Sequence, residues 1–402
     1  MKNRIGTTLA ATVLVALLSG PALAAGTYDT GATDTSIKIG NTWPYSGAGS
    51  GSVPGVRGLA AFFKSLNDKG GINGRKIDFD SVDDGYLPPK TVEQTRKLVE
   101  EDGVLFIFGS LGTPTGEAVA PYLNSHKTPQ LFLITGGSAL ADPAKYPWSM
   151  VGIVSYAAEG RVFAHYLLKE KPNAKVALLY QDDDFGRDHL DAFVETLGPN
   201  ASRMVVAKAS YQFTDPTLNS QMISLKSSGA DTIYLITQGR AAPQAVSAIR
   251  SLDWHPLILL SQVSTTKGII GPAGNEALKG VISAGTEKDP SIPENANDPA
   301  VKEYLAWMQK YVPQTDWETD RYSPAFYDLG SVMAEVLRRC GDDLTRANVM
   351  KQATHLDRFT LPLLLPGVSV STSPTNYFPF RTMVMERFDG ERWVPFGPAL
   401  SG

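Results

Sequence analysis

Cysteine is nearly absent from this chain of 402 residues, because Cys340 is the only one. A single cysteine cannot form an intramolecular disulfide, so the fold must be stabilised by burial of apolar side chains. Hydrophobic residues make up 43% of the chain, which is typical of a globular protein with a real core. Cys340 ends a helical pattern, and we interpret it as a buried structural thiol.

The chain also lacks the residue patterns of common metal and catalytic sites. None of its five histidines lies two or four positions from another, and HExxH, paired-cysteine and GxSxG patterns do not occur. An exported hydrolase would have to pair Ser138 or Thr113 with a distant histidine. We therefore predict a protein that is not an enzyme and that holds no metal and no cofactor.

Positive charge and long apolar runs are both scarce. Outside residues 1–25, which contain Lys2 and Arg4, 35 basic residues stand against 41 acidic ones, a net charge of −6. An acidic chain is a poor partner for nucleic acid or an anionic membrane surface. The longest apolar run, near the N-terminus, is about fifteen residues, shorter than the ~20 that span a bilayer.

Residues 1–25 have the pattern of a cleavable export signal. Lys2 and Arg4 precede an apolar run, and Ala22-Leu23-Ala24 forms an A-x-A cleavage site. A lipid anchor would need a cysteine just after the cut, and none is there. We expect a protein released without an anchor into the periplasm of a double-membraned bacterium.

Strand-like apolar runs alternate with amphipathic helical patterns, which predicts an α/β fold with parallel sheets covered by helices on both faces. The pattern occurs twice in succession and so indicates two lobes. We predict one lobe from residues 26–151 plus 286–377, a second from 152–285 plus 378–402, and three crossings between them. The predicted strands are 36–40, 76–80, 104–108, 130–134, 175–180, 203–208, 232–237 and 257–260, followed by a C-terminal hairpin that turns at Asp389-Gly390.

Two loops suggest other ligands at first sight. The Gly47–Ser52 loop lies between a strand and a helix, but it lacks the Lys-Ser/Thr of a P-loop and the spacing of a dinucleotide fingerprint. The Asp182–Asp184 cluster lacks the glycine and glutamate of a calcium loop. We therefore predict that the glycine-rich loop binds no nucleotide, and we interpret the acidic cluster as a solvated helix cap.

Loops rich in hydroxyl groups follow two neighbouring predicted strands. Gly109–Thr115, which includes Leu111 and Thr113, follows the third strand, and Thr135–Ala139 follows the fourth. Backbone N–H groups and hydroxyls at helix N-termini can hold a carboxylate without a full countercharge. Turn or cap roles for these loops remain open, but their occurrence at one sheet edge favours a shared anion site.

Several segments resemble the periplasmic solute-binding proteins of branched-chain amino acid type ABC importers, the Leu/Ile/Val-binding family. The similarity covers most of the chain after residue 25 and is strongest in Gly70-Gly71-Ile72-Asn73-Gly74 with the following Asp83-Asp84. Supporting matches are Ile37–Gly40 with Tyr45-Ser46-Gly47, the two hydroxyl-rich loops, and Asp184-Phe185-Gly186. The resemblance implies two hinged lobes that close on a ligand, and a membrane permease that recognises the closed form.

The resemblance also implies site residues. Thr113 matches a donor to the ligand carboxylate, and Gly136, Gly137 and Ser138 match the loop that holds the same group. Phe185 and Tyr327 match pocket aromatics, while Arg240 and Gln262 lie where the family recognises the amino end of its ligand. The expected ligand-binding residues, with the aromatic walls of the first loop, are Trp43, Tyr45, Leu111, Thr113, Gly136, Gly137, Ser138, Phe185, Arg240, Gln262 and Tyr327.

The ligand expected from these residues is a small carboxylate with an aromatic or branched apolar body. Amino-acid binders of this type place a carboxylate near the ligand ammonium, and here Arg240 and Gln262 stand at those positions. An amino-acid ligand remains the alternative, since Asp182, Asp184 or Asp328 could compensate. We expect a monomer that delivers its ligand to a permease. A periplasmic sensor for a receptor or kinase is the other class, and a neighbouring permease or kinase gene would distinguish the two.

Overall fold

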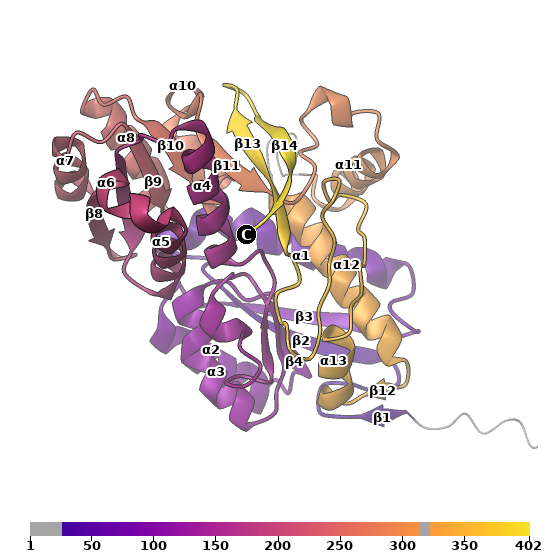
Figure 1. Ribbon diagram of the computed structural model, residues 1–402. Coiled ribbons are helices and arrows are strands. Elements are labelled where there is room, and N and C mark those ends of the chain that lie inside the picture. The colour runs from indigo at the N-terminus through magenta and orange to yellow at the C-terminus, as the bar shows by residue number, and fades with distance from the viewer. Residues whose placement is uncertain (1–25, 314–321) are drawn as a thin grey trace, which may run out of the picture.

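The computed structural model describes residues 26–313 and 322–402, which form two lobes (Figure 1). The predicted export signal, residues 1–25, lies outside the described residues. No helix within the described ranges is long and apolar enough to cross a membrane.

The first lobe is built on a five-stranded parallel sheet. Its strand order is β3 (Lys76–Asp83), β2 (Ser36–Trp43), β4 (Phe106–Phe108), β5 (Gln130–Leu133) and β6 (Ser149–Val151). The sequence pattern ends the first strand at Gly40, but β2 stays paired with β3 as far as Trp43 opposite Asp83. The longer strand places the Trp43 side chain inside the lobe, where it is fully buried.

The second lobe is built on a seven-stranded mixed sheet. Five strands are parallel, in the order β8 (Val205–Tyr211), β7 (Val176–Gln181), β9 (Thr232–Ile236), β10 (Leu257–Leu260) and β11 (Ile282–Gly285). The predicted C-terminal hairpin, β13 (Thr382–Phe388) and β14 (Trp393–Ser401), adds two antiparallel strands beside β11. Its turn is stabilised by the Asp389 N–H, which donates to the Arg392 carbonyl at 3.0 Å.

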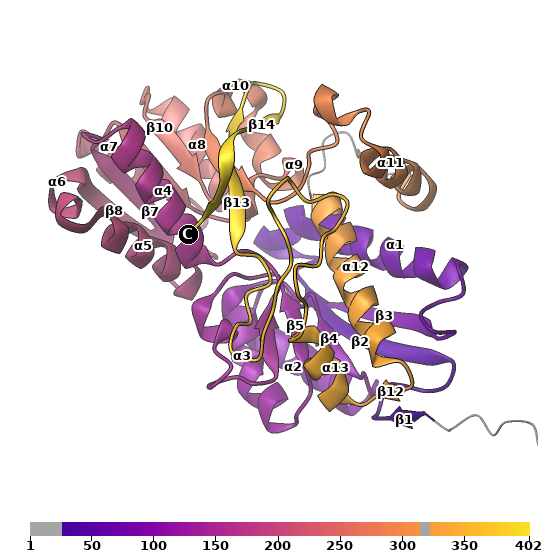
Figure 2. The same cartoon turned by 45° about the vertical axis from the view of Figure 1, so that its right-hand side comes forward.

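Helices cover the sheets of both lobes (Figure 1, Figure 2). Those of the first lobe are α1 (Val53–Asp68), α2 (Pro88–Glu100), α3 (Thr113–Ser125), α11 (Pro299–Tyr311), α12 (Tyr322–Cys340) and α13 (Arg346–Ala353), and β1 (Thr27–Tyr28) pairs with β12 (Asp343–Leu344) at the edge. Those of the second are α4 (Tyr156–Glu170), α5 (Asp184–Leu197), α6 (Ala201–Met204), α7 (Asn219–Ser227), α8 (Ala241–Ser251), α9 (Lys267–Ile270) and α10 (Asn275–Leu278).

Sequence patterning missed α4 and placed two strand starts too early, at 104 where β4 begins at Phe106 and at 203 where β8 begins at Val205. α4 packs against α5, and its buried face contains Glu159 and Gly160, so its pattern lacks the simple apolar stripe of a surface helix. Arg203 and Met204, predicted to open a strand, end the short helix α6 that follows Pro199, and β8 begins only at Val205. The fixed φ of proline favours such a helical start.

The chain passes between the two sheets three times within the described residues. The passages are residues 151–156, 285–299 and 353–382, close to the boundaries predicted at 151, 285 and 377. Because the first lobe contains both an early and a late segment, α1 and α12 lie side by side although they are far apart in sequence (Figure 2). The exact division into lobes at those residues stays a prediction.

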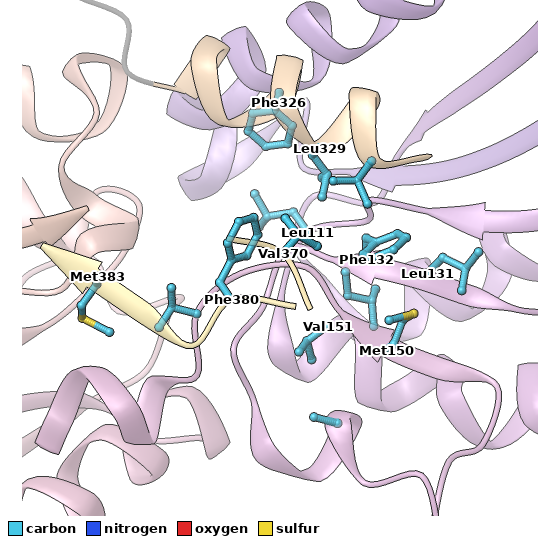
Figure 3. Packing of buried hydrophobic residues seen from close by; sticks show 14 of the residues in the cluster. Leu111, Leu131, Phe132, Met150, Val151, Phe326, Leu329, Val370, Phe380 and Met383 are labelled. Atoms are coloured by element: carbon cyan, nitrogen blue, oxygen red, sulfur yellow. The ribbon is translucent and has the colours of Figure 1, made fainter. Parts of the chain in front are cut away.

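The apolar core extends from the first sheet to the region between the lobes. Figure 3 shows Phe326 and Leu329 on α12 next to Leu111 and Phe380, with Phe132 and Val151 deeper in the first lobe. Cys340 is free and buried at the end of α12, and burial raises the pKa of its thiol to about 12. A neutral, buried thiol is a structural one, as predicted.

Candidate functional site

A cavity of about 120 Å³ lies between the lobes, and segments from both lobes line it. The first lobe contributes the ends of its strands and α12, and the second contributes the loops after β8, β9 and β10 and the crossing after β11. The lining residues are Gly49, Ser52, Tyr86, Leu111, Ile134, Gly152, Ile153, Tyr156, Phe213, Gln238, Gly239, Gln262, Val263, Thr265, Thr266, Ile269, Ala284, Gly285, Thr286, Glu287, Ala325, Phe326, Leu329 and Phe380.

The described lining is mostly apolar, and its polar groups are hydroxyls and amides. Glu287 is the only charged side chain among the described lining residues, and no lysine, arginine or histidine is among them. Aromatic and aliphatic walls with a few placed polar groups are typical of a small-molecule site. No group of three or more histidine, cysteine or acidic side chains suited to a metal occurs in the described part of the chain.

Two donors on the second-lobe wall of the cavity have no hydrogen-bond partner. The Gln262 Nε2 and Thr266 Oγ1 atoms are buried, and neither bonds to another group of the described chain. Both belong to the segment that runs from the end of β10 into α9. A buried donor without an acceptor is costly, so these two atoms are suited to a ligand oxygen.

The threonine hydroxyls of the first-lobe loops bond within the protein. Thr113 Oγ1 and Thr135 Oγ1 lie 2.7 Å apart, and the Gly137 N–H donates to Thr135 Oγ1 at 3.1 Å. The Tyr156 hydroxyl completes the group: burial raises the pKa of Tyr156 to about 12, opposed by hydrogen bonds with Thr135, the Gly136 backbone and Thr113. These donors therefore face a protein side chain, and Tyr156 is the residue that faces the cavity.

Ser138 contacts the opposite lobe. Its N–H donates to the Asp188 carboxylate of α5 at 2.6 Å. Burial raises the pKa of Asp188, and the Ser138 backbone and side chain lower it. A carboxylate thus does bind this loop, but it is a carboxylate of the protein.

Three other expected residues lie one layer behind the cavity or beside it. Trp43 donates from Nε1 to Ser52 Oγ at 3.0 Å and packs edge-on against Phe326 at 5.4 Å, so it supports two lining residues. Phe185 is buried behind Tyr156, with ring centroids 5.0 Å apart. Tyr327 points into the α1–α11 contact, where its ring lies 4.9 Å from Trp307.

Tyr45 and Arg240 lie outside the cavity. The Tyr45 hydroxyl donates to Ser81 Oγ at 2.8 Å, and its side chain is exposed. The Arg240 guanidinium donates to the carbonyls of Thr214 and Asp215 at 2.9 and 3.0 Å. Of the eleven expected residues, the structure therefore places Leu111 and Gln262 on the cavity wall.

Tyr86 and Phe213 are cavity residues that sequence reasoning missed, and they join the two lobes. Their rings lie 4.1 Å apart, and the Tyr86 hydroxyl accepts from Gln238 Nε2 at 2.5 Å. The sequence signal for Tyr86 is the pair Asp83-Asp84, which precedes it by two residues. Asp84 Oδ1 accepts a hydrogen bond from the Tyr86 N–H at 2.9 Å and thereby fixes the tyrosine backbone. That pair thus positions a wall residue at the lobe contact.

Asp328, considered above as a partner for an ammonium group, is buried near the cavity wall. Neither of its carboxyl oxygens has a hydrogen-bond partner among the described residues, and burial, followed by the charge of Glu287, raises its pKa well above the usual range. The carboxyl is therefore held neutral. Asp182 and Asp184 are bound to Arg187 at 2.9 and 3.2 Å on the exposed side of α5.

Comparison with known proteins gives the same architecture. The structure matches a branched-chain amino acid ABC transporter protein from Thermus thermophilus with bound valine, at a TM-score of 0.81 and 14% identity over 92% of this chain and 97% of that one. It also matches a fatty acid ABC transporter substrate-binding protein from Thermomonospora curvata, at 0.77 and 20% over 94% and 95%.

Two curated relatives are similar in sequence. The Leu/Ile/Val-binding protein homolog 7 of Brucella suis is 26% identical over 245 residues, which is 56% of each chain. The amino acid binding protein of Pseudomonas aeruginosa is 23% identical over 260 residues, 61% of this chain and 66% of that protein. The matched part therefore spans little more than half to two thirds of these relatives.

The family model described as periplasmic binding protein matches residues 36–386, nearly the whole described chain. Its members are extracytoplasmic solute-binding proteins of the type I two-lobed fold, which confirms the predicted family, fold class and non-enzymatic role. With a cavity between two α/β lobes and a match of this extent, the chain belongs to the periplasmic binding protein family.

Proposed function

We propose that this protein is the binding component of an ABC importer and that it captures a small carboxylate with an apolar body between its lobes. The observation that carries the proposal is the pair of unpartnered donors, Gln262 Nε2 and Thr266 Oγ1, on a cavity wall that is otherwise mainly apolar. A carboxylate supplies the acceptors that both donors lack. Its apolar body then contacts side chains such as Leu111, Phe326 and Phe380.

The expected site residues enter this proposal in two groups. Leu111 and Gln262 contact the ligand directly. Trp43, Thr113, Gly136, Gly137 and Phe185 act through the lining residues that they hold, chiefly Ser52, Phe326 and Tyr156. Ser138 acts through the lobe contact with Asp188. Tyr45, Arg240 and Tyr327 are left out of the ligand contacts, because their side chains lie away from the cavity.

An amino acid with an apolar side chain is the second candidate. Glu287 places an acidic side chain on the cavity wall, and an acid there stabilises a ligand ammonium group. The names of two relatives, a Leu/Ile/Val-binding homolog and an amino acid binding protein, agree with this class. The valine and the fatty acid in the two structural neighbours' descriptions share a carboxylate, which both candidates contain.

Matched ligand pairs separate the two candidates in isothermal titration. Leucine and 4-methylpentanoate differ only in the ammonium group, as do phenylalanine and 3-phenylpropanoate. The first proposal expects the two plain acids to bind at least as tightly as the amino acids. Tighter binding of the amino acids supports the second candidate instead. The amines 3-methylbutylamine and 2-phenylethylamine lack the carboxylate, and binding of these with no binding of any acid would overturn both.

Delivery to a permease is the other half of the proposal. The lobes already touch through Tyr86, Gln238 and the Ser138–Asp188 bond, and a closed surface built from both lobes is what a permease could recognise. We propose a monomer that acts free in the periplasm after removal of residues 1–25. Ligand-stimulated ATP hydrolysis by an ABC permease complex, reconstituted in vesicles and supplied with this protein, tests this role. Absence of stimulation by the loaded protein would contradict it.

A further inference from the structure

Three polar side chains meet in the core of the second lobe, where no ligand is expected. Glu159 on α4, His189 on α5 and Ser261 after β10 are all completely buried. His189 Nε2 lies 3.0 Å from Glu159 Oε2, and Ser261 Oγ donates to the same oxygen at 3.3 Å. A cluster of this kind needs a reason other than stability, since apolar side chains of similar volume serve a core as well or better.

Counting donors and acceptors shows that Glu159 and His189 together carry no net charge. His189 Nδ1 lies 2.8 Å from the Phe185 carbonyl, which can only accept, so Nδ1 carries a hydrogen. Nε2 and Glu159 Oε2 then need one further hydrogen between them. The pair is neutral as a whole, whichever of the two atoms holds that hydrogen.

The cluster reaches the cavity through two lining residues. The other carboxyl oxygen, Glu159 Oε1, accepts a hydrogen bond from the Gln262 N–H at 2.8 Å. The His189 ring stacks on Tyr156, with centroids 4.6 Å apart and planes at 27°. Gln262 carries one of the unpartnered donors. The Tyr156 hydroxyl lies against Thr113, Thr135 and the Gly136 backbone of the first lobe.

The close approach of the two helices is built into the sequence at Gly160. A Cβ at this position would lie 2.5 Å from the His189 carbonyl oxygen, so any larger residue would push α4 away from α5. Glu159 and His189 can meet only because this contact is open. The pair therefore depends on a specific helix packing and is not an accident of side-chain rotation.

We propose that Glu159 and His189 are positioning residues for the ligand site. Glu159 fixes the backbone that presents the Gln262 amide, and His189 fixes the ring plane of Tyr156. One buried pair thus fixes two separate parts of the cavity lining, the Gln262 backbone and the Tyr156 ring. The inference rests on the proposed function, because it concerns the same cavity.

Replacement of Glu159 by leucine tests the proposal. Glu159→Leu keeps the volume roughly but removes the acceptor that the Gln262 N–H, Ser261 and His189 share, so the melting temperature should fall while amide exchange at Gln262 speeds up by about tenfold or more. Exchange is read by mass spectrometry on peptides that cover residues 259–266. The tightest binder among leucine, phenylalanine, 4-methylpentanoate and 3-phenylpropanoate should lose about tenfold in affinity.

Two further variants separate positioning from general damage. Glu159→Gln keeps an oxygen acceptor and should restore part of the affinity and of the exchange protection, and it decides the question alone if the leucine variant does not fold. Phe193→Leu, in the core on α5, the helix that carries His189, should lower the melting temperature without a comparable loss of affinity.

Two results would overturn the inference: unchanged exchange at residues 259–266 in both Glu159 variants, or an affinity loss no greater than that of Phe193→Leu. If none of the four probes binds, the proposed ligand class fails. The exchange measurement on ligand-free protein then still decides whether Glu159 holds the Gln262 backbone.

Discussion

The two walls of the cavity differ in whether their hydrogen-bond donors already have partners within the protein. On the first-lobe side, the Thr113 and Thr135 hydroxyls bond to each other and to Tyr156, and the Gly137 N–H donates to Thr135. On the second-lobe side, Gln262 Nε2 and Thr266 Oγ1 have no hydrogen-bond partner in residues 26–313 and 322–402. Both walls are rich in hydroxyls and amides, so composition alone does not show which donors remain available. The difference assigns a supporting role to the first-lobe loops and a binding role to the second-lobe loop.

The largest expected effect concerns the part of the cavity wall that α12 of the first lobe contributes. Phe326 is buried between Trp43 and the cavity, and its replacement by alanine removes the edge-on partner of Trp43. We expect Phe326→Ala to lower the free energy of unfolding by about 3–5 kcal/mol. Denaturant unfolding followed by tryptophan fluorescence measures this. A loss below about 1 kcal/mol would mean that the cavity collapses without cost.

A direct test of the comparison replaces one donor on each wall. Gln262→Met removes an unpartnered amide, so stability should stay unchanged while the affinity for a carboxylate such as 3-phenylpropanoate falls by about tenfold or more. Titration calorimetry and thermal unfolding give the two numbers.

Thr113→Val is the matched variant on the other wall. It removes one hydrogen-bond partner from Thr135 and from Tyr156, so it should cost about 1–3 kcal/mol of stability and change affinity far less. The reverse outcome, with affinity lost at Thr113 and kept at Gln262, would transfer the binding role back to the first lobe.

The smallest effect is a dependence of closure on pH. Burial, and then Asp184, Asp183 and Asp188 of the opposite lobe, raise the pKa of Glu117 on α3 to about 8 from 4.5. An acid whose pKa is raised in the closed form is protonated there and ionised when the lobes separate. Closure therefore takes up a proton between about pH 4.5 and 8. Its favourable contribution is fully present below that window and is lost as the pH rises through it.

Ligand affinity measured from pH 5 to 9 checks this expectation. Affinity should fall up to about pH 8 and then level off, and Glu117→Gln should flatten the profile. Glu93→Gln, which replaces an exposed acid on α2, is the control and should leave the profile unchanged. A wild-type profile that is already flat would show that α3 and α5 separate too little on opening to change the environment of Glu117.

Much of the fold could be read from the sequence, and less of the site. Alternating strands and helices predicted both parallel sheets and the hairpin at Asp389-Gly390, because these patterns depend on local periodicity and turn chemistry. α4 escaped detection, since its buried face carries Glu159 and Gly160. Trp43 and Phe185 looked like ligand walls because aromatic residues in strand-end loops suit both packing and binding, and only burial distinguishes the two.

The sequence by itself determined the family, the two-lobed α/β architecture and the hydroxyl-rich loops at the ends of the strands. These follow from short-range patterns in a single chain. The tertiary structure alone decided which donors are already used. A hydroxyl is available to a ligand only if no distant side chain reaches it, and Tyr156 reaches the loops of Thr113 and Thr135 while nothing in the described chain reaches Gln262 Nε2. Contacts between segments so far apart in sequence are fixed by the packing of the lobes.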